Sequence, residues 1–224
     1  MRRSPKVDEV LPLIAVEDGY RESKEGWQTM LRGLKKRGLS MPVVAVGDGA
    51  LGFWAAVRDV WPETKEQRCW VHRLANVLDK LPKRLQDRAK QALHEIMNAE
   101  TKAEAERAAN VFEAASGAKY PKAVTSLRRN IPKLLTVYAF PAEHWRHLRT
   151  TNVLESPFAT VRLRQRVTKA AGSRTKALTM AFKLLEMAQL RWRRLNGPAL
   201  LPLVAPGVKY EGGVQLQCKE DRAA

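Results

Sequence analysis

Two carboxylates stand in sequence surroundings that suit chemistry on a phosphate group. Asp48 comes directly after the apolar run of residues 41–46 and Gly47, at the expected end of a buried strand. Glu155 stands at the expected start of a helix, shortly before a stretch that is rich in arginine. Carboxylate oxygens are the ligands that Mg²⁺ prefers in proteins, and the cations around Glu155 would attract phosphate. The pattern favours metal-dependent chemistry on nucleic acid, with Asp48 and Glu155 as candidate metal ligands.

The basic charge of the chain is concentrated in one segment. Of a formal net charge of +17, residues 146–194 contribute +10, with 12 Lys and Arg against 2 Asp and Glu. A solvated helix face usually interleaves acids with bases, so the imbalance favours a nucleic-acid partner over that simpler alternative. An RNA-binding protein is a weaker alternative, because no RRM-type or KH-type signature is present. The candidate DNA-binding residues are Arg149, Asn152, Arg162, Arg164, Arg166 and Lys169.

The surroundings of Asp48 allow two other interpretations. Residues 47–52 match the dinucleotide fingerprint G-x-G-x-x-G, with Glu66 close to the place of a ribose-binding acid. Against this, Asp48 would oppose the pyrophosphate, and too few strands follow to build a doubly wound sheet. The simpler alternative is that Gly47 and Gly49 only allow a tight turn from strand to helix.

Two other candidate residues also have simple alternatives. Asn152 and Glu155 have the spacing of a capping box, in which the glutamate only holds the start of its helix. Cys69 and His72 provide half the ligands of a zinc site, and no second pair completes it.

The first 75 residues predict alternating strands and helices. Strands are expected at residues 10–16, 41–46 and 67–71, and helices at 23–36 and from Gly49 to Pro62. Such a β-α-β-α-β order implies parallel pairing with right-handed crossovers. Open sheets place their sites at the carboxyl ends of strands, which is where Asp48 is expected.

After residue 75 the strand signals stop and helical spacing takes over. Thr101 and Glu104 form a capping box that opens one helix. Another helix is expected over residues 121–138 with an interruption at Pro132, and a long amphipathic helix over 175–196 ends before Gly197. The tail from residue 198 is rich in Pro and Gly and is expected to pack loosely.

Length and composition bound the class of protein. A chain of 224 residues fits one large domain or two small ones. Cys69 and Cys218 stand in unrelated contexts, so no disulfide framework is implied and a reducing cytoplasm fits. No apolar stretch of membrane-spanning length and no signal peptide is evident. We therefore expect a soluble, cytoplasmic and nucleoid-associated protein with no membrane partner.

Three segments together resemble the bacterial Mutator-type insertion-sequence transposases. The segments are Gly47–Trp54, Gln67–Arg73 with Asn76, and Arg149–Ser156 with Arg162–Arg164. They occur in the family's order and at matching separations, so the resemblance is specific and covers most of the chain.

The resemblance implies an α/β fold: an incomplete RNase H-like mixed sheet flanked by helices, with an all-α insertion. Family members use two Asp and one Glu to hold Mg²⁺ or Mn²⁺, as two ions in a complete site. Asp48 matches the second acid and Glu155 the third, while Cys69 and His72 match a Cys-x-x-His signature next to the active site. The implied function is metal-dependent cleavage and transfer of DNA strands, at element ends and target, by a homo-oligomer on DNA.

The implied division has four parts. They are a partial RNase H-like core without its first strand (1–75), the all-α insertion (76–148), returning core helices with the catalytic Glu and the basic stripe (149–197), and a flexible tail (198–224). The first acid of the family pattern has no match, since Asp8 lacks a similar context; Glu17 and Asp18 are the nearest candidates for a substitute.

We therefore expect a truncated transposase copy with little or no strand cleavage on its own. The alternative is a non-catalytic DNA-binding remnant, or a regulator of an intact transposase.

Overall fold

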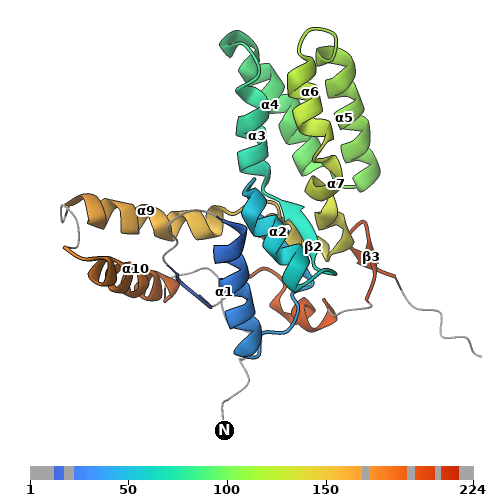
Figure 1. Cartoon of the computed structure of the whole chain (residues 1–224). Helices are drawn as coiled ribbons and strands as arrows, with labels where there is room; N and C mark the ends of the chain where they lie inside the picture. Colours follow the sequence, from blue (N-terminus) through green and yellow to red (C-terminus); the bar gives the residue numbers. More distant parts are fainter. Residues whose placement is uncertain (1–12, 18–22, 168–171, 191–194, 205–207, 217–224) are drawn as a thin grey trace, which may run out of the picture.

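The structure is a computed structural model that describes residues 13–17, 23–167, 172–190, 195–204 and 208–216; the side chains of residues 153–156 lie outside this description. The protein is a mixed α/β structure, mostly helical with a small sheet (Figure 1). The helices of residues 70–148 and the last two long helices extend from the sheet in different directions.

The first helix packs against the second to form a small core of their own. Helix α1 (Lys24–Lys36) begins at Ser23, whose hydroxyl accepts a hydrogen bond from the Gly26 N–H, and the chain turns away at Gly38 with φ of 94°. Both features agree with the predicted helix. Leu31 and Leu34 are buried against α2 (Leu51–Val60), which begins after Gly49 as predicted.

The sheet consists of two parallel strands joined by α2. Strand β1 (Val44–Gly47) pairs with β2 (Lys65–Arg68), with Gly47 opposite Arg68. Parallel pairing is confirmed, but two details of the prediction are wrong. The first three residues of β1 are half-buried rather than buried on both faces. The second strand begins at Lys65 and ends before Cys69, because backbone hydrogen bonds to β1 hold this polar segment, whereas Trp70 already begins a helix.

The strand expected at residues 10–16 is not formed where the structure describes it. Residues 13–17 have no sheet neighbour, and residues 10–12 lie outside the described part. Side chains bind this segment instead. The Leu13 N–H donates to the Gln189 side chain at 2.7 Å, and Arg37 donates to the Ile14 carbonyl at 3.0 Å.

Residues 70–148 fold into a compact group of helices, the helical module. It contains α3 (Trp70–Leu78), α4 (Lys83–Asn98), α5 (Lys102–Ser116), α6 (Pro121–Arg128), α7 (Ile131–Leu134), the 3₁₀ helices η1 (Thr136–Ala139) and η2 (Ala142–His144), and α8 (Trp145–Leu148). The capping box of Thr101 and Glu104 is present as predicted. The predicted interruption of the helix over residues 121–138 is present, but it comes at Arg129 and Asn130, because Pro132 lies in the first turn of α7, where its missing N–H is tolerated.

A continuous apolar core holds the helical module together. Side chains from nearly every element contribute to it, and each stabilises the fold by about 1.5–3 kcal/mol relative to exposure. The core includes Trp70, Val77, Leu93, Ile96, Phe112, Leu127, Leu134, Tyr138 and Trp145.

The helical module is fixed to β2 by buried polar contacts. The Gln67 side chain is fully buried, accepts the Val137 N–H at 2.7 Å and donates to the Leu134 carbonyl at 3.1 Å. The Thr136 hydroxyl donates to the Glu66 carbonyl at 2.9 Å. Because these bonds join neighbouring residues of one strand to one short stretch of the module, they set the position of the module relative to the sheet.

Two long helices follow, which we name the α9–α10 pair. Helices α9 (Asn152–Val167) and α10 (Arg174–Gln189) lie side by side (Figure 1). Helix α10 ends at Gln189, earlier than the predicted Asn196, which lies in irregular chain. The 3₁₀ helix η3 (Pro198–Leu203) and the antiparallel strands β3 (Tyr210–Glu211) and β4 (Val214–Gln215) complete the described residues, so strands do recur after residue 75. No described helix is both long and apolar enough to cross a membrane.

Candidate active site and nucleic-acid surface

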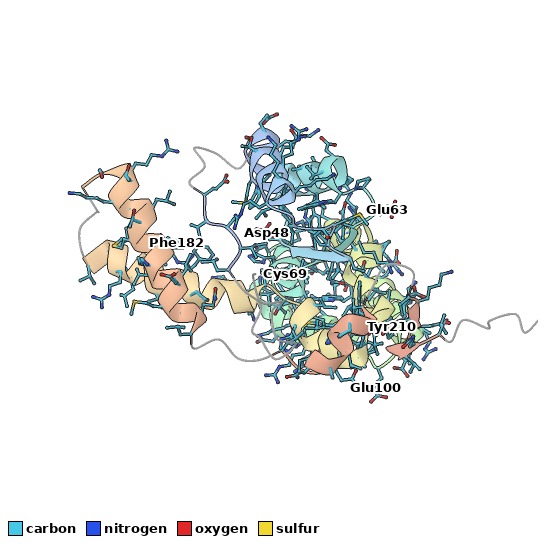
Figure 2. The ribbon with its side chains drawn as sticks, turned by 90° about the horizontal axis from the view of Figure 1, so that it is seen from below. Asp48, Glu63, Cys69, Glu100, Phe182 and Tyr210 are labelled. Atoms are coloured by element: carbon cyan, nitrogen blue, oxygen red, sulfur yellow. The ribbon has the colours of Figure 1, made fainter. Side chains whose placement is uncertain are left out.

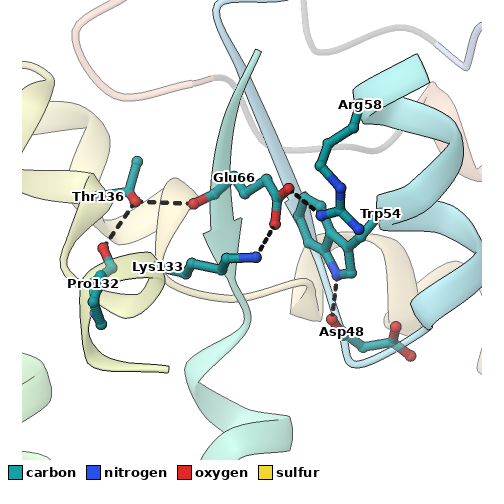
Figure 3. Close-up of polar contacts among 7 residues, drawn as sticks. All are labelled: Asp48, Trp54, Arg58, Glu66, Pro132, Lys133 and Thr136. Carbon is teal, nitrogen blue, oxygen red and sulfur yellow. Dashed lines mark hydrogen bonds and ion pairs between the residues drawn. The ribbon is translucent and has the colours of Figure 1, made fainter. Parts of the chain in front are cut away.

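Asp48 lies at the carboxyl end of β1, in a turn that α2 holds in place. Its Oδ1 accepts the Ala50 N–H at 2.9 Å, and its carbonyl accepts the Trp54 indole N–H at 2.9 Å (Figure 3). Gly47 permits this close packing, because a Cβ there would lie 2.9 Å from the Trp54 ring. The turn therefore fixes the Asp48 carboxylate at the edge of the sheet.

Cys69 occupies the neighbouring position after β2. Its N–H donates to the Gly47 carbonyl at 2.8 Å, which brings the ends of the two strands together; Figure 2 labels Asp48 and Cys69 in this region. We name this part, residues 47–49 and 68–69, the carboxyl edge. As expected for parallel strands, it gathers residues from two separate sequence motifs.

The start of α9 is attached to the same edge. The Trp70 N–H donates to the Arg149 carbonyl at 2.9 Å. The Thr151 N–H and hydroxyl both point to the Cys69 sulfur, at 3.4 and 3.3 Å. The residues just before α9 are thus bound to the chain at the end of β2, across about eighty residues of sequence.

The Cys69 thiol is buried in this contact. Burial alone would raise its pKa, but hydrogen bonds from Thr151 and His72 outweigh that effect and lower it. His72 lies in the first turn of α3 and contributes to the surroundings of the sulfur. The two residues of the Cys-x-x-His pattern therefore do meet, and they meet at the carboxyl edge.

Glu155 lies in the first turn of α9, the helix that is attached to this edge. Its side chain is outside the described residues, so its distance from Asp48 stays a prediction. Within the described part, no three His, Cys, Asp or Glu side chains are grouped as a metal site would need.

The arginine-rich stripe lies on the exposed surface of α9. Arg162 and Arg166 are one turn apart and share a helix face, and Arg164 is exposed as well. Asn152 is exposed at the helix start, and Lys169 lies outside the described residues.

Arg149 has a different position from the other candidate DNA contacts. It is half-buried, its guanidinium lies 5.4 Å from the centre of the Trp145 ring, and it donates to the Ala99 carbonyl at 3.4 Å. Its side chain therefore packs against the helical module, where a structural contribution accompanies any contact with DNA.

The surroundings of Glu66 weaken the dinucleotide interpretation. Lys133 and Arg58 each pair with its carboxylate at 2.5 Å (Figure 3). Burial would raise the pKa of Glu66, but these two cations lower it overall. An acid engaged by two cations is poorly placed to bind a ribose hydroxyl.

The sequence alone did not predict a function for three residues of this region. Trp54 holds the Asp48 turn, Thr151 attaches α9 to Cys69, and Gln67 fixes the helical module. All three residues lie within the motifs that carry the family resemblance, but their contacts depend on the folded chain.

Comparison with known proteins identifies the family. The sequence model described as "Transposase, Mutator family" matches residues 9–194. The chain belongs to this family. It is 54% identical over 209 residues to the transposase for insertion sequence element IS6120 of Mycolicibacterium smegmatis, an alignment that covers 93% of this chain and 65% of that protein.

Two further relatives carry similar names. The transposase for insertion sequence element IST2 of Acidithiobacillus ferrooxidans is 50% identical, with 90% of this chain and 69% of that protein aligned. The transposase for element ISRM5 of Rhizobium meliloti is 30% identical, with 82% and 46% aligned. The chain thus spans about two thirds or less of the length of these relatives.

Proposed function

We propose that this chain carries the catalytic region of an insertion-sequence transposase, with Asp48 and Glu155 at one metal-dependent site for DNA strand cleavage and transfer. The attachment of α9 to the carboxyl edge supports this proposal most strongly, because it brings the helix that contains Glu155 to the end of the sheet that contains Asp48. An RNase H-like arrangement of the sheet is part of the same proposal.

The donor chemistry of Asp48 fits Mg²⁺ or Mn²⁺. Its Oδ1 accepts one backbone hydrogen bond, while Oδ2 has no hydrogen bond or ion pair to any described residue. A hard carboxylate oxygen at the end of a strand is a suitable ligand for a hard cation. When bound, two such ions would supply charge stabilisation for the attacking and leaving oxygens of the phosphodiester.

The remaining residues would position the DNA. The arginines on the exposed face of α9 would neutralise backbone phosphates and hold the strand beside the carboxyl edge. The hydrogen bond from Trp54 would keep the Asp48 carboxylate in a fixed position at the carboxyl edge. The contact between Cys69 and Thr151 would hold the start of α9 beside it. Element ends and target DNA are the proposed substrates, and a homo-oligomer is the proposed form on DNA.

Binding and cutting of duplex DNA test the proposal together. In EDTA, the wild-type chain should bind DNA through the exposed arginines of α9, and Mg²⁺ should further increase the affinity. Asp48→Asn and Glu155→Gln should each lose that increase and keep the binding seen in EDTA. An increase that persists in Asp48→Asn would contradict the assignment of the metal site.

The same samples of protein, DNA and metal distinguish catalysis from the second candidate function, which is non-catalytic DNA binding. The exposed arginines of α9 favour it, since they suffice for binding without any chemistry. Strand cuts that need Mg²⁺ or Mn²⁺ and disappear in Asp48→Asn would establish catalysis by these residues. Binding with neither cuts nor an effect of metal would support the binding function alone.

A further inference from the structure

Arg68, the last residue of β2, lies beside Asp48 at the carboxyl edge. Its guanidinium carbon is 6.0 Å from the centre of the Trp54 ring. A Cβ placed on Gly49 would lie 3.1 Å from its Nη2, so the turn after Asp48 runs directly against the guanidinium. The side chain is thus held between α2 and the turn that carries the candidate metal ligand.

The guanidinium of Arg68 is half-buried, yet it forms no hydrogen bond or ion pair with any residue that the structure describes. Comparable arginines are engaged: Arg58 pairs with Glu66 at 2.5 Å, and Arg73 donates to the Ser126 hydroxyl at 3.2 Å. A guanidinium carries five N–H donors and stays protonated in proteins. None of the Arg68 nitrogens is among the described buried atoms that lack a partner, so these donors reach the protein surface and can bind the acceptors of a ligand there.

The charge of the guanidinium itself makes an anion the fitting ligand for Arg68. Burial lowers the pKa of Arg68, and the negative charges of Asp48, Glu66 and Cys69 oppose this effect. Asp48 is therefore close enough to interact with Arg68, but the two form no ion pair, and the Asp48 Oδ1 accepts the Ala50 N–H instead. Arg73, whose pKa is lowered by burial and by nearby Arg68, adds a second positive charge to the same region.

We propose that Arg68 binds the non-bridging oxygens of a DNA phosphate at the carboxyl edge, next to the metal site of Asp48. This inference rests on the proposed function and adds a specific phosphate contact to it. The planar fork of a guanidinium matches two phosphate oxygens at once, which a lysine ammonium cannot do. Trp54, whose ring centre lies 6.0 Å from the guanidinium carbon, helps to hold the guanidinium in place.

Salt-dependent binding of the full chain to a short fluorescein-labelled DNA duplex, in EDTA, tests this contact. Arg68→Gln should weaken binding by about tenfold or more, the range expected for a hydrogen bond to a charged group. It should also reduce the slope of log affinity against log salt by about 0.9. Arg58→Gln is the matched control, because it removes the same charge from the same side of the sheet but from a guanidinium already paired with Glu66.

Arg68→Lys separates charge from geometry. It should retain the wild-type salt slope, because the charge remains, and still bind more weakly, because the fork is absent. If circular dichroism shows that Arg68→Gln does not fold, Arg68→Lys alone tests whether Arg68 binds a DNA phosphate. Wild-type affinity in Arg68→Lys would then overturn the inference.

The outcomes separate this inference from the proposed function. If the wild-type chain fails to bind DNA, the proposed function itself fails. If the wild-type chain binds and Arg68→Gln behaves like Arg58→Gln, DNA binding stands and the phosphate contact of Arg68 is overturned.

Discussion

The helical module and the α9–α10 pair are both helical, but large apolar side chains are buried in the module and exposed on the pair. In the module these side chains meet in one core, and Leu93 and Ile96 are completely buried. In the pair, large apolar side chains stay exposed among the cations, with Leu163 at 55% and Met187 at 63%. The module is held by its own packing, whereas α9 is positioned by contacts of the residues just before it with the chain at the end of β2.

The difference in packing suits the two regions to different functions. A region with a buried core and polar bonds to β2 is suited to hold the carboxyl edge in a fixed shape. A pair of helices with an exposed face of arginines is suited to contact DNA. The comparison can be tested by substitutions that should damage one region and spare the other.

The largest effect is expected from a cavity in the helical module. Leu93→Ala should lower the free energy of unfolding by about 2–5 kcal/mol, because it removes a fully buried side chain. Leu163→Ala on α9 should change it by less than about 0.5 kcal/mol, because that side chain is largely exposed. Urea unfolding followed by circular dichroism measures both. Equal losses in the two variants would remove the contrast between the regions.

The next effect concerns DNA and should run in the opposite direction. Replacing Arg162, Arg164 and Arg166 together with Gln should weaken DNA binding and flatten the salt slope by up to about 0.9 for each phosphate that is no longer neutralised. The unfolding free energy should hardly change, since these side chains are exposed.

A matched triple variant in the module serves as the control. Arg84, Arg88 and Lys90 are exposed on α4, and their replacement by Gln removes the same formal charge. Fluorescence anisotropy should show much stronger binding for this control than for the α9 variant. Identical affinities would mean that net charge alone drives binding and that the α9 face has no special role.

A smaller effect tests the connection between the module and the sheet. Gln67→Leu keeps the volume but leaves the Val137 N–H without its acceptor, at a cost of about 1–3 kcal/mol. Gln91→Leu, on an exposed position of α4, is the control and should be nearly neutral. Amide hydrogen exchange at Val137 should accelerate in the first variant only; unchanged protection there would show that the bond does not fix the module.

The smallest effect is a pH dependence near the end of α8. The Asn196 N–H donates to His147 Nε2 at 3.0 Å, so that nitrogen must be unprotonated. Burial lowers the pKa of His147 below its ordinary 6.5, so this hydrogen bond is complete above that pH and breaks as the pH falls through the lower folded-state value. Amide exchange at Asn196 should accelerate on acidification. His147→Gln, which does not titrate, should show no such dependence, and an equal dependence in that variant would exclude His147 as its source.

Local patterns were sufficient for part of the fold. Thr101 and Glu104 predicted their helix start because a capping box depends only on neighbouring residues. Parallel pairing of the strands followed from their order, and the family resemblance implied that Cys69 would lie next to the active site. The position of β2 was not predictable in the same way, because Lys65–Arg68 is polar and is held by hydrogen bonds to β1 and to Leu134 and Val137.

The candidate site shows the same limit. The sequence indicated Asp48 and the start of α9 separately, from a strand end and from a cluster of arginines. It could not indicate that Thr151 would bind the Cys69 sulfur, since that contact joins residues 82 positions apart. Nor did it indicate Arg68, whose importance lies in the acceptors that it lacks among the described residues.

Iron-directed cleavage of the protein backbone tests the central claim, that the carboxyl edge and the start of α9 form one metal site. Fe²⁺ takes the place of Mg²⁺, and ascorbate with peroxide then generates radicals that cut the chain close to the ion. We predict cuts near Asp48 and near residues 152–155 in the same sample, suppressed by excess Mg²⁺ and absent in Asp48→Asn. Cuts near Asp48 without cuts at the start of α9, or a pattern that Asp48→Asn leaves unchanged, would contradict the account.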